Sequence, residues 1–374
     1  MPEISVLETS AEAKVLEEGV ARGAVLPSAL PLPWPALPAE DIPVPTAGRW
    51  RRWLAYALVG LVATFLLAAL AGFCFEWHVE ARDAKRFPMR GQLVDVGGYR
   101  LHLYCIGASN PTVVLSGGFT DTLEQWKEIQ PEIARFARVC SFDRAGLGWS
   151  DAGPMPRSSG QIAKELHTAL ANAGIPGPYV LVGHSFGGLD MRIFAGQHPN
   201  EVAGILLIDS VNPYFYRWDL PGGFRSEMRF WLYRHLTSFG ITRLLGECHS
   251  GPRPCPEFVD TWHAMWEARI LSAYEARATS SFGNAPLIVI AHDPLFYLMP
   301  VDKPERVEWE PQFARAQMQL TQLSANASFL IARKTGHQIP RDKPQLVVSA
   351  VAKLVGLARA TSPSSQQCSS CDER

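Results

Sequence analysis

The sequence predicts an α/β fold for about residues 92–357: a mostly parallel sheet with helices on both faces. Short apolar runs with the length of buried strands recur along this stretch, and several end directly in Gly or Asp. Segments with helical periodicity separate some of them. Strands that alternate with helices favour a parallel sheet, because each crossover covers one face and returns the chain to the same end of the sheet.

The elements of this domain are expected in a regular order. An opening hairpin turns at Gly97-Gly98. The helix that follows the fourth strand begins at Ser158, which has capping-box spacing to Gln161, and ends before Gly174. The expected strands are 92–96, 101–105, 112–115, 138–142, 179–182, 203–208, 287–291 and 329–332, and the expected helices are 158–173, 188–197 and about 345–357.

The strand pattern stops between roughly residues 212 and 284, and we expect an inserted, mostly helical segment there. Its position among the strands favours a lid over an active site, with an ordinary helical subdomain as the alternative. The segment is rich in aromatic residues, namely Tyr214, Phe215, Tyr216, Trp218, Phe230, Trp231, Tyr233, Trp262 and Trp266.

Three segments outside the domain differ in composition. Residues 1–48 are polar and then rich in proline, and residues 358–374 are polar, so both are expected to be disordered. Residues 54–75 carry no charged side chain, and about 20 apolar residues suffice for a helix to cross the hydrocarbon core. We therefore expect a single transmembrane helix, with Trp53 and Trp77 as flanking interface residues.

The charges next to this span predict its orientation. Arg49, Arg51 and Arg52 precede the span, and positive charges favour the cytoplasmic side of a membrane. The large domain is therefore expected outside the cytoplasm. Cys248 and Cys255 bracket a loop rich in Gly and Pro and could close a disulfide in such a compartment, with two free thiols as the alternative.

Composition excludes several classes of function. The 374-residue chain has a formal net charge of -1, so it lacks the basic surplus typical of nucleic-acid binding. Its seven cysteines match no clustered metal site, since the pair Cys368 and Cys371 lacks two further ligands. There is also no H-E-x-x-H motif. We expect no metal, no cofactor and no nucleic-acid partner.

The strongest motif is GHSFG at 183–187, between the expected strand 179–182 and the helical run 188–197. A G-x-S-x-G in this setting is typical of a nucleophile elbow, a tight turn that lifts a serine hydroxyl clear of the sheet. Glycines suit the turn because a Cβ would clash there. The helix N-terminus behind the serine favours developing negative charge. Ser185 is therefore the predicted nucleophile.

Several segments together resemble the α/β-hydrolase fold superfamily over about residues 92–357. They are VVLSGGF at 113–119, SFDRAGLGWSD at 141–151, the GHSFG motif, and TGH at 335–337. The second segment is similar to the family's D-x-R-G-x-G-x-S loop, from which Ala145 before Gly146 departs without touching a catalytic position. The resemblance implies hydrolysis through a serine nucleophile.

The resemblance also implies the partners of that serine. His337 follows the last strand, as the family's catalytic histidine does, and is the expected base. Phe186 and Phe119 occupy the positions of the two backbone donors of the oxyanion hole. The third member of the triad, the acid that orients His337, could be either of two aspartates at strand ends. Most relatives place it after the next-to-last strand, which points to Asp293, but Asp209 matches relatives that place it one strand earlier and is preferred.

These features together predict a membrane-anchored serine hydrolase that cleaves an ester through a covalent acyl-Ser185 intermediate. The aromatic insert suggests a small, hydrophobic substrate. An aminopeptidase or amidase of the same fold is the nearest alternative, and a non-catalytic binding protein that kept the fold is the other. A dehalogenase of this fold is excluded, because its nucleophile is an aspartate and this elbow carries Ser185.

Overall fold

The structure, a computed structural model, describes residues 48–214, 224–246, 248, 252–296 and 304–361. Almost all of the predicted N-terminal arm and of the predicted C-terminal tail lies outside these residues. Internal contacts divide the chain into two units, Met1–Leu61 and Val62–Arg374. The α/β domain belongs entirely to the second unit.

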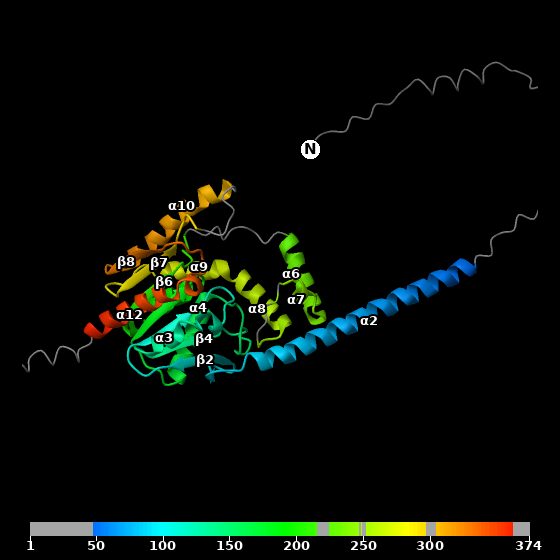
Figure 1. The fold of residues 1–374 in the computed structure, drawn as a ribbon, viewed down its shortest axis with the longest axis horizontal. Coiled ribbons are helices and arrows are strands. Elements are labelled where there is room, and N and C mark those ends of the chain that lie inside the picture. Colours follow the sequence, from blue (N-terminus) through cyan, green and yellow to red (C-terminus); the bar gives the residue numbers. More distant parts are fainter. Residues whose placement is uncertain (1–47, 215–223, 247, 249–251, 297–303, 362–374) are drawn as a thin grey trace, which may run out of the picture. The chain divides into compact units, whose positions relative to one another are not determined.

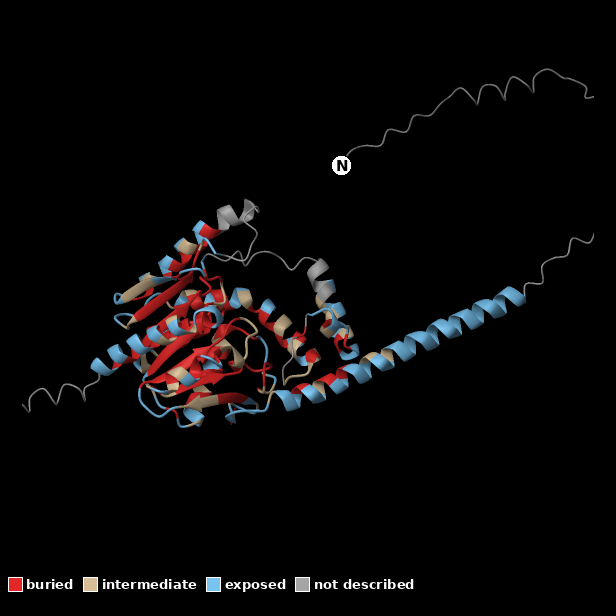
Figure 2. Ribbon diagram, viewed as in Figure 1, coloured by how far each residue is buried: buried red, intermediate tan, exposed pale blue. Residues whose placement is uncertain are grey.

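The first helix, α2 (Arg49–Arg86), contains the predicted span and continues past it. Its most apolar stretch is long enough to cross a membrane, and none of that stretch is buried. In Figure 2 the ribbon of this stretch is mostly pale blue, the colour of exposed residues. Because so much exposed apolar surface is unfavourable in water, α2 is a candidate transmembrane helix. Near its C-terminal end the pattern changes, and Glu76, Val79 and Asp83 are buried.

An eight-stranded sheet forms the centre of the second unit, in the order β1-β2-β4-β3-β5-β6-β7-β8. Strand β2 pairs antiparallel with both β1 and β4, and all the other neighbouring pairs are parallel. The mostly parallel sheet is therefore confirmed. The strands are β1 (Gln92–Asp95), β2 (Arg100–Ile106), β3 (Thr112–Ser116), β4 (Val139–Phe142), β5 (Tyr179–His184), β6 (Val202–Ile208), β7 (Leu287–His292) and β8 (Ala327–Ala332).

Side chains alternate along the central strands and fill two separate cores. In β5, Leu181 belongs to one core, whereas Val180 and Val182 belong to the other. A strand buried on both faces is therefore continuously apolar, as the sequence of β5 is. Figure 1 shows the helices that cover the sheet. The first core is closed by α4 (Ser159–Asn172), α5 (Gly187–Gln197) and α9 (Arg269–Ala278), and the second by α3 (Gln130–Ala134), α11 (Ile339–Asp342) and α12 (Pro344–Ala360).

Helix α4 begins and ends where its sequence predicts. The Ser158 hydroxyl accepts the N–H of Gln161 at 3.3 Å, which forms half of a capping box. The Gln161 amide donates to Glu165 at 3.0 Å instead of reaching back to Ser158. Gly174 ends the helix with a φ of 66°, a conformation that favours glycine.

The segment that interrupts the strands is helical in its described parts. Its last helix, α9, packs on the domain, since Ser272 accepts the N–H of Ser159 at 2.9 Å and Glu275 accepts that of Gly160 at 2.8 Å. The insert's other elements are α6 (Phe224–Leu236), η3 (Thr237–Phe239), α7 (Ile241–Leu244) and α8 (Cys255–Glu267).

Among the described elements, three helices of the domain have no counterpart in the prediction: the short α3 and α11, and the longer α10. Helix α10 (Pro304–Gln319) lies between β7 and β8 and contains Pro311 in its interior. An internal proline and few apolar residues weaken the helical period, so the pattern did not indicate this helix. The remaining short elements are η1 (Leu123–Trp126), η2 (Pro199–Glu201) and η4 (Leu320–Leu323).

Candidate active site

Ser185 lies in the tight turn between β5 and α5, at the carboxyl edge of the sheet. Its φ is 53°, in the left-handed region that residues other than glycine rarely adopt. Its backbone N–H donates to the carbonyl of Ile208 in the neighbouring strand at 3.0 Å. Strain of this kind persists where the surroundings hold it, and it concentrates at functional sites.

The two glycines that frame the turn are required by close approach. A Cβ on Gly183 would lie 2.6 Å from the carbonyl oxygen of Gly187. A Cβ on Gly187 would lie 2.4 Å from the carbonyl oxygens of both Ser116 and Gly117. These glycines therefore let β5, α5 and the loop after β3 meet behind the serine.

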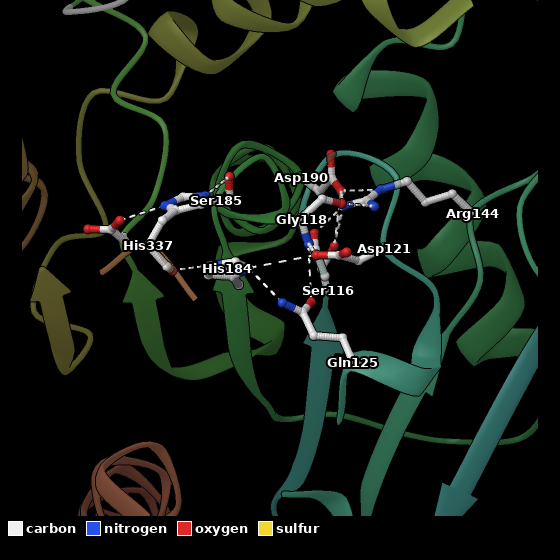
Figure 3. Close-up of polar contacts among 11 residues, drawn as sticks. Ser116, Gly118, Asp121, Gln125, Arg144, His184, Ser185, Asp190 and His337 are labelled. Carbon is white, nitrogen blue, oxygen red and sulfur yellow. Dashed lines mark hydrogen bonds and ion pairs between the residues drawn. The ribbon is translucent and has the colours of Figure 1, made fainter. Parts of the chain in front are cut away.

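His337 connects Ser185 to a carboxylate. Its Nε2 lies 2.9 Å from the Ser185 Oγ, and its Nδ1 lies 2.6 Å from Oδ2 of Asp209. Figure 3 shows the imidazole ring directed at the serine hydroxyl. A proton held on Nδ1 by Asp209 leaves Nε2 free to accept the proton of Ser185.

The two aspartates that the sequence left open have different partners. Asp209 directly follows β6, and its carboxylate accepts from Nδ1 of His337. Asp293 follows β7, and its carboxylate accepts the N–H groups of Lys334 at 2.9 Å and Leu295 at 3.1 Å. The structure therefore brings Asp209, and not Asp293, to the histidine.

Asp209 is ionised in spite of its burial. Its backbone is strained, with a φ of 44°. Burial disfavours the charged carboxylate, but hydrogen bonds from His292 and His337 outweigh that effect and lower the pKa of Asp209 to about 2. A carboxylate with this pKa stays negative through the neutral range, so it can stabilise a protonated His337.

His184 supports the loop that carries His337. Its Nε2 lies 2.9 Å from the carbonyl oxygen of His337, and its Nδ1 lies 2.7 Å from Nε2 of Gln125 (Figure 3). Since a carbonyl can only accept, Nε2 carries the proton and Nδ1 accepts from the glutamine. Burial and the neighbouring His337 lower the pKa of His184 to about 4, so the ring is neutral at pH 7.

The two predicted oxyanion donors lie in neighbouring loops. Phe186 directly precedes α5, Phe119 follows β3, and their rings meet edge to face at 5.1 Å. Within the described part of the chain, neither backbone N–H donates a hydrogen bond to another residue. Both groups are thus available to a ligand oxygen.

Arg144 holds the loop of Phe119 in place, a role that the sequence did not predict. It donates to the carbonyl oxygens of Gly117 and Gly118, each at 2.6 Å, and to Oδ2 of Asp190 at 2.7 Å (Figure 3). Both members of the ion pair are buried. Arg144 belongs to a motif that the sequence does reveal, but its partner in the first turn of α5 follows only from the fold.

A cavity of about 420 Å³ opens next to the loops that carry Phe119 and His337, although neither of these two residues lines it. Its lining includes Thr120 and Gln338, the residues directly after Phe119 and His337, together with Phe258 of the inserted helix α8. A space of this size accommodates a small molecule.

The described residues contain one cluster of metal-binding types, His167, His198 and Glu201, next to the start of β6. The two imidazole rings are stacked, with centroids 3.7 Å apart and planes within 4° of parallel. One ion cannot lie in the plane of both rings, so this arrangement does not hold a metal as it stands.

Comparison with known proteins gives a consistent result. A family model described as alpha/beta hydrolase fold matches residues 111–293. An uncharacterized protein of Schizosaccharomyces pombe is 32% identical over 180 residues, which are 41% of this chain and 33% of that protein. An AB hydrolase superfamily protein of Gibberella zeae is 25% identical over 281 residues, or 67% of this chain and 87% of that protein. The chain thus spans only a third of the length of the yeast relative.

Solved structures show the same architecture. A thermophilic esterase from Thermogutta terrifontis superposes with a TM-score of 0.51 and 21% identity, covering 71% of this chain and 98% of that one. At this identity the similarity shows the fold alone.

Proposed function

Since the chain belongs to the α/β-hydrolase fold superfamily, we propose that it is a serine esterase that cleaves small hydrophobic esters. The fold supports a hydrolase but serves many chemistries, so the proposal rests on the site. The observation that carries it is the relay of 2.9 Å from Ser185 to His337 and 2.6 Å from His337 to Asp209.

In the first half of the reaction, Ser185 Oγ attacks the carbonyl carbon of the ester while His337 Nε2 takes its proton. The carbonyl oxygen becomes an oxyanion, which the N–H groups of Phe119 and Phe186 stabilise. Asp209 keeps the imidazole in the required tautomer and balances its positive charge. His337 then gives its proton to the departing alkoxide, which leaves as an alcohol and leaves an acyl-Ser185.

In the second half, water replaces the alcohol. His337 takes a proton from the water as its oxygen attacks the acyl carbon, and a second oxyanion forms in the same place. When this intermediate collapses, the proton returns to Ser185 Oγ and the carboxylic acid is released. In each half of the reaction, His337 therefore takes one proton and gives one proton back, while Asp209 orients it. No bound cofactor enters the proposed reaction.

The preference for a hydrophobic substrate rests on aromatic side chains next to the predicted oxyanion loop. The ring of Phe119 meets that of Phe186 at 5.1 Å and that of Trp266 at 6.4 Å, both edge to face. Trp266 comes from α8, so the inserted helices contribute to the wall of the site, as a lid would. An apolar acyl or alcohol group buried against these rings is stabilised by loss of water contact.

The test is replacement of the nucleophile. We expect Ser185→Ala to abolish both labelling by a fluorophosphonate and turnover of short aryl esters, with a loss on the order of 10⁶ in rate. Ser349→Ala is the matched control, because Ser349 is an exposed serine on α12 that bonds only its own helix. Retention of most activity by Ser185→Ala would refute a serine mechanism. A parallel panel of aryl amides and amino-acid amides distinguishes an esterase from an amidase.

A further inference from the structure

The acid of the relay has a second histidine neighbour. His292 ends β7, and its Nδ1 lies 2.9 Å from both carboxylate oxygens of Asp209. Its backbone N–H also donates to Oδ1 of the same carboxylate at 3.0 Å. On the other side of the ring, Nε2 lies 3.1 Å from Oε2 of Glu310 in α10. The His292 side chain is 1% exposed, so water does not substitute for these contacts.

The positions of these atoms restrict where protons can be. A neutral imidazole carries one N–H, whereas both nitrogens of His292 face carboxylate oxygens, which accept when ionised. A neutral ring beside two ionised carboxylates would leave a lone pair of the ring against a lone pair of an oxygen. The geometry therefore requires one additional proton on the His292–Glu310 pair. Two flanking carboxylates favour that proton on the ring, which is then a doubly protonated imidazolium.

The surroundings of the ring support a cation. Burial lowers the pKa of His292, but its hydrogen bonds and charge interactions with Asp209 and Glu310 outweigh burial and raise it. Phe313 of α10 stacks on the ring, with centroids 4.8 Å apart. Among the described residues, further ionisable groups near the ring include Asp293, the next residue in the chain, and His337 on the far side of Asp209.

We propose that His292 is a positioning residue of the Ser185 site, a protonated imidazole between Asp209 and Glu310 that holds the Asp209 carboxylate against His337. This inference rests on the proposed function. The backbone N–H of His292 donates to Oδ1 of Asp209, and its ring Nδ1 lies 2.9 Å from both oxygens. These contacts hold the carboxylate with Oδ2 at 2.6 Å from Nδ1 of His337. Without His292 the buried carboxylate is free to rotate away from the base.

The charge of His292 has a second effect, with a definite sign. A cation beside Asp209 weakens the attraction of that carboxylate for a proton on His337. The base must be neutral to accept the proton of Ser185, so kcat/KM falls at low pH as the base becomes protonated. Removal of the cation favours the protonated base, and the acid limb of kcat/KM therefore moves to higher pH.

The experiment compares three variants of the full-length chain in detergent or nanodiscs, with active sites counted by fluorophosphonate. His292→Asn keeps a neutral donor toward Asp209, and we expect its acid limb to move up by on the order of 1 pH unit. His292→Leu removes the donor, and we expect kcat per labelled site to fall about 100-fold. Glu310→Gln removes a negative charge, while the amide oxygen can still accept from Nε2 of His292. We therefore expect its acid limb to move in the opposite direction, to lower pH, by less than His292→Asn moves it up, since Glu310 lies farther from the base.

The matched control is Asp293→Asn. It removes a carboxylate at the same strand end whose hydrogen bonds, among the described residues, go to the backbone of Lys334 and Leu295. We expect its acid limb to stay within about 0.2 pH units of the wild type. A direct readout is ¹⁵N NMR of the histidines, in which an imidazolium signal at pH 7 disappears in His292→Asn.

The outcomes separate this inference from the proposed function. Wild-type pH profiles and wild-type kcat per labelled site in all His292 variants, even with a lowered Tm, would make His292 merely structural and overturn the inference. A neutral His292 ring in the NMR spectrum would also overturn it. Absence of labelling and of ester turnover in the wild type would instead reject the esterase, while the NMR signal would still report the charge of His292.

Discussion

Asp209 is the residue on which the contacts of the candidate site converge. It receives N–H groups from His337 and from the ring and backbone of His292, and its own N–H donates to Ile290 at 2.6 Å. Its φ of 44° joins that of Ser185 among the few positive values outside glycine. Two strained residues at the ends of adjacent strands are expected where a sheet is built to present reacting groups at its edge.

We expect the same substitution to have very different effects on kcat at the two aspartates. Asp209→Asn removes the negative charge and offers an amide N–H₂ where His337 needs an acceptor, so the imidazole is held in the wrong tautomer. We expect kcat to fall by about 10⁴, with the fold retained. Within the described residues, the Asp293 carboxylate bonds backbone N–H groups and not His337, so we expect Asp293→Asn to lose less than about 10-fold in kcat.

Steady-state kinetics with a short aryl ester measures both variants, and circular dichroism checks their folding. The reverse order of effects, with Asp293→Asn inactive and Asp209→Asn near normal, would contradict the assignment of the acid.

The sequence predicted the candidate residues to different degrees. Ser185 and His337 were found because each stands in a local pattern, a framed G-x-S-x-G and a TGH after the last strand. No local pattern marks His292 or Glu310. The contact of His292 with Asp209 joins residues 83 positions apart, and it depends on the register of β6 with β7, which a single sequence does not specify.

At the scale of elements, the end of α2 is joined to the inserted segment by a buried ion cluster. Arg243 of α7 donates to Glu76 at 2.8 Å and to Asp83 at 2.9 Å. The side chains are 10%, 3% and 0% exposed, respectively. The predicted helix ended at Phe75, because it was defined as a stretch without charged residues and Glu76 follows. The structure shows that these charges continue the helix and bind Arg243.

We predict that Arg243→Met destabilises the inserted segment. It leaves two buried carboxylates without a cation, and breaking a buried pair from one side costs about 3–5 kcal/mol. The measurement is urea denaturation of the full chain in detergent, followed by limited proteolysis between α6 and α8. Arg135→Met is the control, since Arg135 is exposed and its partner Glu132 is only half-buried, and a pair of this kind contributes at most about 1 kcal/mol. Equal midpoints for the two variants would contradict a structural role for the cluster.

At the scale of the whole molecule, the α/β alternation was predictable because strand and helix periods differ and the buried strands are continuously apolar. The antiparallel pairing of β2 with β4 was harder to predict from the sequence, since it joins strands that are not neighbours in the chain. This pairing places Cys105 opposite Cys140, and the structure links them in a disulfide. A second disulfide joins Cys248 to Cys255, one of the two possibilities that the sequence left open.

The disulfides and the charges next to α2 lead to one prediction about topology. Disulfides persist in oxidising compartments, and Arg49, Arg51 and Arg52 favour a cytoplasmic N-terminal side of the helix. We therefore expect the domain outside the cytoplasm.

A compartment-sensitive reporter fused to the C-terminus measures this, and an identical fusion with the three arginines changed to glutamate tests the charge rule. Peptide mapping without reductant should find Cys105–Cys140 and Cys248–Cys255 linked. A reporter active only in the cytoplasm, with those four thiols open to alkylation, would place the domain inside and remove both bonds from the native protein.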